Sequence, residues 1–111
     1  MRRIIFVDID ETICFHEKDP SDGGPREYHT AQPCQENIDK INRLYDDGHK
    51  IVYWTARGSR SGIDWYDFTK NQLLEWGAKF HELKCDKPFY DIFVEDRSMR
   101  IEEVNDALYS S

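Results

Sequence analysis

Ile4-Ile-Phe-Val-Asp8-Ile-Asp10-Glu-Thr12 is the stretch of sequence that decides the fold of this chain. A short apolar run rich in Ile and Val is typical of a strand buried on both faces, at the centre of a parallel sheet. Ligands of open α/β folds bind at the carboxyl ends of such strands. We therefore expect Asp8 to end this strand and Asp10 and Thr12 to lie on the following loop. The alternative is a plain turn, because Asp often begins one.

Length and composition indicate one soluble globular domain over residues 1–111. Hydrophobic residues make up 39% and charged residues 33% of the chain, which is typical of a folded domain rather than a disordered one. The net charge of -7 argues against nucleic acid or an anionic membrane as a partner. No apolar run approaches the roughly 20 residues that span a bilayer. Met1-Arg2-Arg3 lacks the features of a signal peptide, so we expect a cytoplasmic protein.

The three cysteines, Cys14, Cys34 and Cys85, are far apart and form no Cys-x-x-Cys pair. Free thiols in a reducing compartment are the simplest interpretation. A zinc site is the alternative, because two cysteines and two histidines bracket one loop. Its ligands would be Cys14, His16, His29 and Cys34, although their spacing matches no common zinc pattern.

Apolar periodicity and turn residues predict strands that alternate with helices along the chain. This βαβα order indicates an α/β fold with right-handed crossovers, that is, a three-layer Rossmann-like parallel sheet. The polar stretch at about 15–33 is expected to be a flap loop or short hairpin beside the ligand-binding edge. The expected elements after it are a helix at 34–47, a strand at 50–55, a helix from Ser61 to Trp76, a strand at 79–83, a strand at 91–96 and a closing helix marked by Ile101, Val104 and Leu108.

Polar residues follow several of these strands at the point where each strand ends. They are Asp8 and Asp10, Thr55, Lys87, and the pair Glu95 and Asp96. Because the carboxyl ends of parallel strands share one edge of a sheet, we expect these residues to converge. Each of them has an ordinary role when taken alone, and it is their shared placement that indicates a site.

Converging carboxylates of Asp8, Asp10 and Asp96 would repel one another, and Mg²⁺ is the natural compensating cation for such oxygen ligands. Lys87 adds a fixed positive charge and Thr55 a hydroxyl group. A cation, a lysine and a hydroxyl group around a carboxylate describe a receptor for a phosphoryl group. A carboxylate in this position can attack phosphorus, and a second carboxyl group nearby suits proton transfer.

These motifs resemble the four signature motifs of the haloacid dehalogenase (HAD) superfamily. Asp8-x-Asp10-x-Thr12, Thr55, Lys87 and Glu95-Asp96 occur in the family's order and span nearly the whole chain. The narrower resemblance is to small capless phosphatases, including those linked with capsular polysaccharide biosynthesis, whose fold is a minimal HAD core without a cap domain. It is carried by three further stretches, Thr55-Ala-Arg-Gly58, Gly62-Ile-Asp-Trp65 and Lys87-Pro88 with Tyr90-Asp91.

The resemblance implies a Mg²⁺-dependent phosphatase acting through an aspartyl-phosphate on Asp8. Asp10 would protonate the leaving oxygen and later activate water. Mg²⁺ would be held by Asp8, the backbone carbonyl of Asp10, and Asp96. Phosphate and substrate would be bound by Thr12, Thr55, Arg57 and Lys87. The chain departs from the common pattern at Glu11, where Gly is frequent, and at Glu95, where Asp is frequent.

The expected substrate is a small phosphorylated metabolite such as a sugar phosphate, by the same resemblance. No insertion is large enough for a cap, so specificity would come from the 15–33 flap, from Arg57 and Arg60, or from a neighbouring subunit of a homo-oligomer. Two rivals stay open. One is a phosphoacceptor receiver module, which needs an acceptor Asp where this chain has Thr55-Ala56-Arg57. The other is an inactive relative that only binds a partner.

Overall fold

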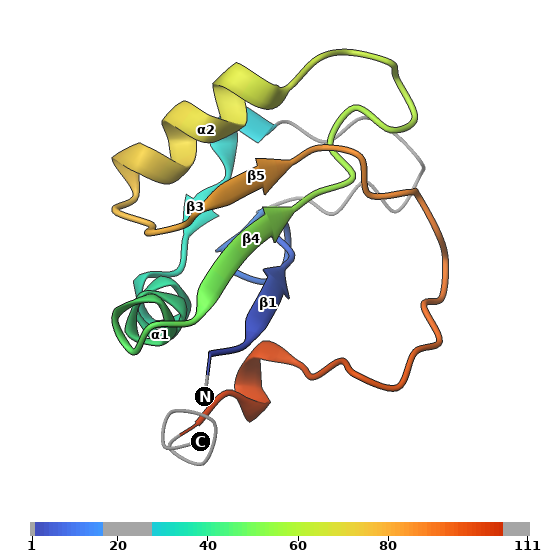
Figure 1. Ribbon diagram of the computed structural model, residues 1–111. Helices are drawn as coiled ribbons and strands as arrows, with labels where there is room; N and C mark the ends of the chain where they lie inside the picture. Colours follow the sequence, from blue (N-terminus) through green and yellow to red (C-terminus); the bar gives the residue numbers. More distant parts are fainter. Residues whose placement is uncertain (1, 17–27, 106–111) are drawn as a thin grey trace.

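Three parallel strands form the sheet of this α/β fold, in the order β1-β4-β5 (Figure 1). The computed structural model describes residues 2–16 and 28–105. The strands are β1 (Ile4–Val7), β4 (Lys50–Trp54) and β5 (Glu82–Lys84). In register, Ile5 lies opposite Ile51, and Tyr53 lies between Val7 and Leu83. The parallel α/β fold predicted from the sequence is confirmed.

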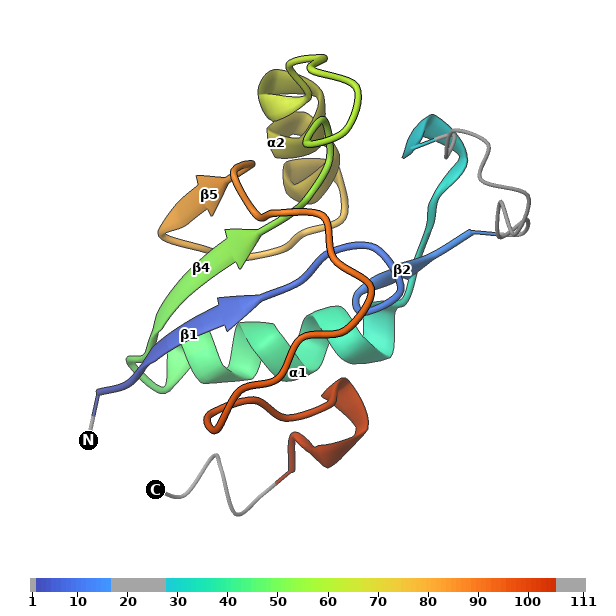
Figure 2. The ribbon, with the colours of Figure 1, turned by 90° about the vertical axis from the view of Figure 1, so that its right-hand side faces the viewer.

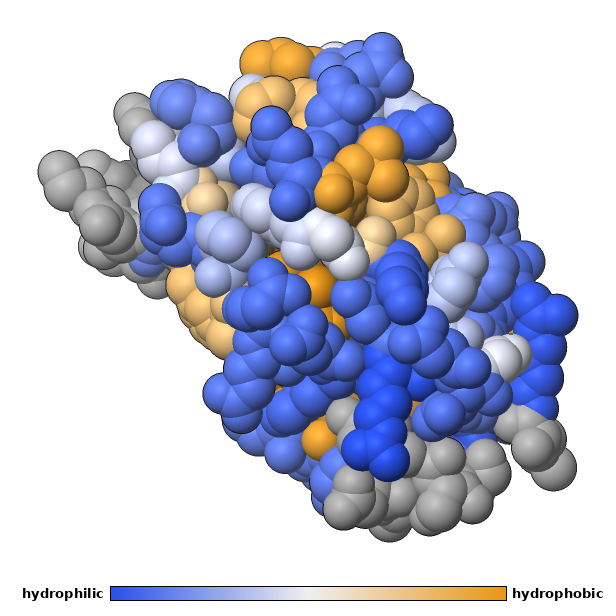
Figure 3. All heavy atoms as spheres, turned by 90° about the vertical axis from the view of Figure 1, so that its left-hand side faces the viewer, coloured by the Kyte–Doolittle hydropathy of each residue, from blue (hydrophilic) through white to orange (hydrophobic). Residues whose placement is uncertain are grey.

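Two α-helices connect these strands and pack on the same face of the sheet. The helices are α1 (Gln35–Asp46) and α2 (Tyr66–Glu75). One hydrophobic cluster joins both helices to the side chains on one face of the strands. The strands contribute Val7, Ile51, Tyr53 and Leu83, with the partly buried Ile5, and the helices contribute Ile38, Ile41 and Leu44 from α1 and Leu73 from α2. The described residues therefore form two layers, one of strands and one of α-helices. The sequence predicted three layers, but no α-helix of the described residues covers the other face of the sheet. The outer side of the helices is mainly hydrophilic with small hydrophobic spots (Figure 3).

The helix predicted at 34–47 is confirmed as α1, and glycine ends both helices. Gly48 and Gly77 adopt φ of 98° and 74°, a left-handed conformation that glycine reaches without steric cost. The start of α2 differs from the prediction. Ser61 and Asp64 each accept a hydrogen bond from the backbone N–H two residues later, which makes local turns, and the helix begins only at Tyr66.

A short antiparallel pair closes the base of the predicted flap. Strand β2 (Cys14–Phe15) pairs with β3 (Gln32–Pro33), and the single turn η1 (Tyr28–Thr30) precedes β3. The sequence predicted a loop or a short hairpin at about 15–33, and the pairing of β2 with β3 shows a hairpin at the two ends of this stretch. Residues 17–27 between them lie outside the described part of the chain. None of the helices in residues 2–16 and 28–105 has the length and apolar character that crossing a membrane requires.

The strand predicted at 91–96 is absent, although Ile, Phe and Val favour strands. The chain between β5 and the single turn η2 (Ile101–Glu103) forms no strand and is drawn as a long loop (Figure 2). Ile92 and Val94 are 80% and 92% exposed, because no neighbouring strand covers them. The closing helix is likewise reduced to η2 within the described residues, and Leu108 lies outside them. The third strand begins at Glu82 rather than residue 79.

Strand β1 consequently lies at the edge of the described sheet and not at its centre. It pairs with β4 alone among these strands. Ile4 is 68% and Phe6 49% exposed on the face that the helices do not cover. The prediction of a strand buried on both faces at the centre of the sheet, which rested on the apolar run alone, is therefore wrong for β1.

Replacing Tyr53 with Phe should raise stability by about 1 kcal/mol, because an unpaired buried hydroxyl group costs free energy. Tyr53 is fully buried, and its hydroxyl oxygen has no hydrogen-bond partner among the described residues. Burial also raises the pKa of this group, so it stays protonated. Denaturant unfolding would measure the change. Tyr66→Phe, at an exposed hydroxyl, is the control expected to change little. A less stable Tyr53→Phe variant would contradict the conclusion that this hydroxyl group is buried without a hydrogen-bond partner.

Candidate functional site

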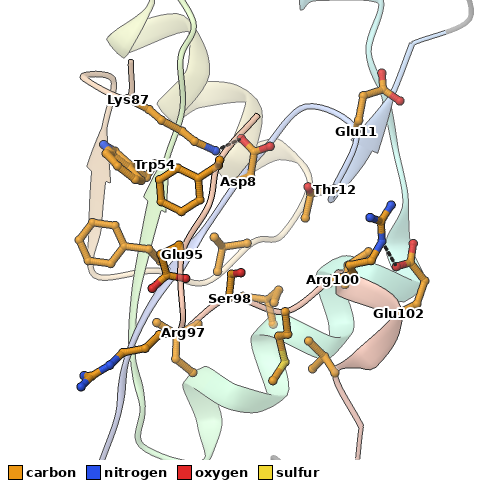
Figure 4. Close-up of a pocket in the computed structure, with 18 of the residues that line it drawn as sticks. Asp8, Glu11, Thr12, Trp54, Lys87, Glu95, Arg97, Ser98, Arg100 and Glu102 are labelled. Carbon is orange, nitrogen blue, oxygen red and sulfur yellow. Dashed lines mark ion pairs between the residues drawn. The ribbon is translucent and has the colours of Figure 1, made fainter. Parts of the chain in front are cut away.

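A cavity of about 490 Å³ lies beside β1 and beneath the segment that follows β5 (Figure 4). Its volume falls within the roughly 300–1,000 Å³ that is usual for small-molecule sites. Charged side chains line it on several sides, and the part that carries Asp8, Thr12 and Lys87 is named its polar end here (Figure 4). The polar lining includes Asp8, Glu11, Thr12, Lys87, Glu95, Arg97, Ser98, Arg100 and Glu102, and the apolar lining includes Phe6, Trp54, Phe93, Met99 and Val104.

Asp8 and Lys87 meet at the polar end of this cavity. Asp8 directly follows β1, and its carboxylate lies 3.5 Å from the Lys87 ammonium group. Burial raises the pKa of Asp8, and the positive charge of Lys87 opposes that rise. The Lys87 backbone N–H donates to the Thr55 carbonyl, which fixes the lysine to the end of β4. The structure therefore brings together two of the residues that the sequence singled out.

Two aromatic rings hold the Lys87 side chain beside Asp8. Its ammonium group lies 5.7 Å from the ring centre of Trp54 and 5.3 Å from that of Tyr90. A cation at this distance is attracted by the ring face. The Trp54 indole N–H in turn donates to Asp86, which fixes the plane of that ring. Sequence reasoning assigned no role to Trp54 or Tyr90, and their positions next to Thr55 and Lys87 were the available signal.

Asp10 does not line the cavity, and its carboxylate belongs to a separate, largely buried cluster. Both carboxylate oxygens accept hydrogen bonds from Arg57, from Nε at 3.0 Å and from Nη2 at 2.8 Å. His16 lies 2.8 Å from Oδ1 of the same carboxylate. Burial acts to raise the pKa of Asp10, but the hydrogen bonds and charge of Arg57, with His16, hold it below its usual value.

Thr55 and Arg57 are buried, and neither lines the cavity. The Thr55 hydroxyl group accepts from the backbone N–H of Arg57 at 3.2 Å. Thr12 does line the cavity, and its carbonyl accepts from the side chain of Asn37 on α1. Of the four residues expected to bind substrate, Thr12 and Lys87 therefore face the cavity in this structure.

The expected Mg²⁺ ligands are not gathered in one place. The Asp96 side chain is 86% exposed, lies 3.9 Å from Arg97 and does not line the cavity, whereas its neighbour Glu95 does. The carboxylates of Asp8, Asp10 and Asp96 form no group whose oxygens all lie within 4.8 Å of one another in the described chain. The reason is the missing strand at 91–96, which would have carried Asp96 to this rim.

One group of metal-ligand types does lie together, namely Asp10, Cys14 and His16, with ligand atoms within 4.8 Å of one another. The Cys14 thiol lies 3.6 Å from Oδ1 of Asp10 and donates a hydrogen bond to it. Arg57 already occupies both oxygens of Asp10 and would repel a cation. His29 and Cys34, the other zinc candidates, do not belong to this group. These contacts describe a hydrogen-bonded cluster better than a zinc site.

The loop after β1 is held in a tight conformation at Glu11. This residue adopts φ of 63°, a left-handed conformation that glycine reaches most easily. The backbone N–H of Glu11 donates to Cys14, and those of Thr12 and Ile13 donate to Ile9. These bonds fix the turn between Asp8 and β2 without a glycine.

Gly58→Ala should destabilise the protein by about 3 kcal/mol, from a left-handed backbone together with a steric clash. Gly58 adopts φ of 88°, and an added Cβ would lie 2.2 Å from the Ile63 carbonyl oxygen. Gly48→Ala is the matched control, because its φ is 98° but no atom lies within 4 Å of the added Cβ. That control should lose only about 1 kcal/mol in denaturant unfolding. Equal losses would show that the clash is relieved without cost.

Comparison with known proteins supports the fold alone. No family model matches the chain, and no curated protein matches it. A similar solved structure is the crystal structure of an MCSG target from Vibrio cholerae, with a TM-score of 0.77 and 19% sequence identity. The match covers 97% of this chain and 94% of that one. At this identity the likeness concerns the arrangement of the chain and carries no function.

Proposed function

We propose that this protein is a phosphomonoester hydrolase in which Asp8 is the nucleophile. The observation that carries the proposal is the Asp8–Lys87 pair, separated by 3.5 Å, at the polar end of a cavity suited to a small molecule. A carboxylate that follows a strand of a parallel sheet, with a fixed ammonium group beside it, suits attack on a bound phosphoryl group. The order of the four motifs supports a minimal HAD core, and a small phosphorylated metabolite such as a sugar phosphate is the proposed substrate.

The proposed reaction has two displacements at phosphorus. An Asp8 oxygen attacks the phosphorus atom, the P–O ester bond breaks, and the alcohol oxygen leaves with the bonding electrons and takes up a proton from water. Water then attacks the aspartyl-phosphate, which releases phosphate and restores the carboxylate. Lys87 balances the negative charge of the phosphoryl oxygens in both steps. Asp10, held ionised by Arg57, suits accepting the proton of the attacking water.

The carboxylates expected to hold Mg²⁺ are not gathered in this arrangement. Asp8 and Glu95 line the cavity, but the carboxylate of Asp96, an expected ligand, faces solvent. Mg²⁺ is usually bound through one or two carboxylates together with waters and substrate phosphates, and of the two expected carboxylates only that of Asp8 faces the cavity. No step is therefore assigned to the ion. A requirement for it would mean that the segment carrying Glu95 and Asp96 adopts another position.

A turnover assay tests the proposal. Purified protein is incubated with p-nitrophenyl phosphate and a panel of phosphorylated metabolites, each with Mg²⁺ and with EDTA. Steady release of phosphate over many turnovers supports a hydrolase. Labelling that stops at one phosphoryl group per protein would favour the receiver module instead, and no release from any ester would overturn the proposal. The central strand β4 ends in Trp54-Thr55, without the acceptor Asp that a receiver needs.

A further inference from the structure

We infer that Arg57 is a positioning residue, which aims the Asp10 carboxylate and ties it to α2 and to the base of the flap hairpin. The inference rests on the proposed function, since it concerns what Asp10 does there. Arg57 Nε donates to Oδ2 of Asp10 and Nη2 donates to Oδ1, so the planar guanidinium group meets both oxygens as a fork. This geometry fixes the carboxylate plane, which a single point contact would leave free to rotate.

The guanidinium group is itself held from the opposite side. Its Nη1 donates to the Gln72 side chain at 2.7 Å and to the Thr69 hydroxyl group at 3.2 Å, both on α2. The ring centre of Tyr28 lies 4.5 Å from its central carbon. Gln72 also donates to the carbonyl of Tyr28, which joins α2 to the hairpin. Arg57 is therefore oriented by three separate parts of the chain.

Charge explains why this arrangement acts on Asp10 rather than on a ligand. The Arg57 side chain is fully buried, and a buried cation is stable only when it is paired. Asp10 is its acidic partner in the described contacts, with Gln72 and Thr69 as neutral acceptors. Neither Arg57 nor Asp10 is among the residues that line the cavity, so Asp10 would act on a substrate there through a water molecule.

The contacts also distinguish the two oxygens of Asp10. Oδ1 accepts from Arg57 and lies 2.8 Å from His16 and 3.6 Å from the Cys14 thiol. Oδ2 is engaged by Arg57 Nε at 3.0 Å. A carboxylate oxygen accepts about two hydrogen bonds. Oδ2 is therefore the oxygen with capacity left to accept a proton from water, and its contact with Arg57 Nε fixes its orientation.

Burst kinetics with p-nitrophenyl phosphate test this role, because a base that takes the proton of the attacking water acts on hydrolysis of the aspartyl-phosphate and not on its formation. Arg57→Met and Asp10→Asn should each lower the steady rate of phosphate release at least about tenfold more than the rate of the initial burst of p-nitrophenol. The double variant should lose no more than Asp10→Asn alone, since residues that act as one unit are not additive. Equal losses in the burst and in the steady rate, or losses that multiply in the double variant, would overturn the inference.

Gln72→Leu provides a milder variant should Arg57→Met fail to fold, because it keeps the Asp10 ion pair and releases only the far side of the guanidinium group. It should show the same larger loss in the steady rate than in the burst, whereas Gln35→Leu, at an exposed glutamine on α1, should not. A Gln72→Leu variant whose burst and steady rate both equal those of the unchanged protein would contradict the positioning role.

Unfolding measurements separate this inference from the proposed function. If Arg57 and Asp10 stabilise each other, the Tm of the double variant should fall by less than the sum of the falls in Tm of the two single variants. Additive losses would show that the two side chains do not act together, whatever the activity. An inactive wild-type protein with a non-additive cycle would instead overturn the hydrolase proposal and leave the tie standing.

Discussion

Asp8→Asn should lower kcat/KM for phosphate release by at least about a thousandfold, because an amide cannot attack phosphorus in place of a carboxylate. The fold should survive the change. The Asp8 side chain is partly buried, with 40% of its surface exposed, and this partial burial raises its pKa. An uncharged Asn at this position therefore avoids the free-energy cost of desolvating a carboxylate. Initial rates with p-nitrophenyl phosphate would measure the activity, and circular dichroism would verify the fold.

The matched control for this change is Asp91→Asn, an identical substitution at an exposed residue of the segment after Lys87. It should keep near-normal activity. A folded Asp8→Asn protein that still releases phosphate would remove Asp8 from the role of nucleophile, and a loss of equal size in both variants would point to a general effect of charge.

Lys87→Ala should lower kcat/KM by about a hundredfold to a thousandfold, the usual effect of removing one group that stabilises transition-state charge. Without the ammonium group 3.5 Å away, the Asp8 carboxylate and the incoming phosphate would repel each other. Inhibition by inorganic phosphate should weaken as well, which competition assays with the aryl ester would measure.

Lys84→Ala is the control for the loss of a lysine near this rim. Its ammonium group lies 5.9 Å from the ring of Phe6, and it does not line the cavity. Steady-state kinetics should therefore show little change. If Lys84→Ala proved as damaging as Lys87→Ala, the effect would belong to the net charge of the surface and not to a phosphate contact.

Local sequence patterns were sufficient to predict those parts of the fold that depend on one helix or strand alone. The helical spacing of Ile38, Ile41 and Leu44 predicted α1, and Gly48 marked its end, because both signals act within a few residues. The meeting of Asp8 with Lys87 was also predictable, since parallel strands place their carboxyl ends on one edge.

Contacts between distant parts of the chain were harder to predict. The residues 91–96 have the composition of a strand, but a strand also needs a partner, and β1 pairs only with β4 in the described sheet. The burial of Arg57 was missed for a related reason. Its partners Asp10, Thr69 and Gln72 are 47, 12 and 15 residues away, and an arginine beside a predicted site suggests ligand binding before it suggests a buried ion pair.

The open side of β1 also bears on how the protein behaves in concentrated solution. An unpaired strand edge is a template for backbone pairing with a neighbouring molecule, and Ile92-Phe93-Val94 offers exposed β-forming residues beside the same cavity. Asp91, Glu95 and Asp96 flank that apolar triplet, and like charges on two approaching copies repel each other. Dissolved salt screens this repulsion, so we expect pairing of two copies through this edge to increase with ionic strength.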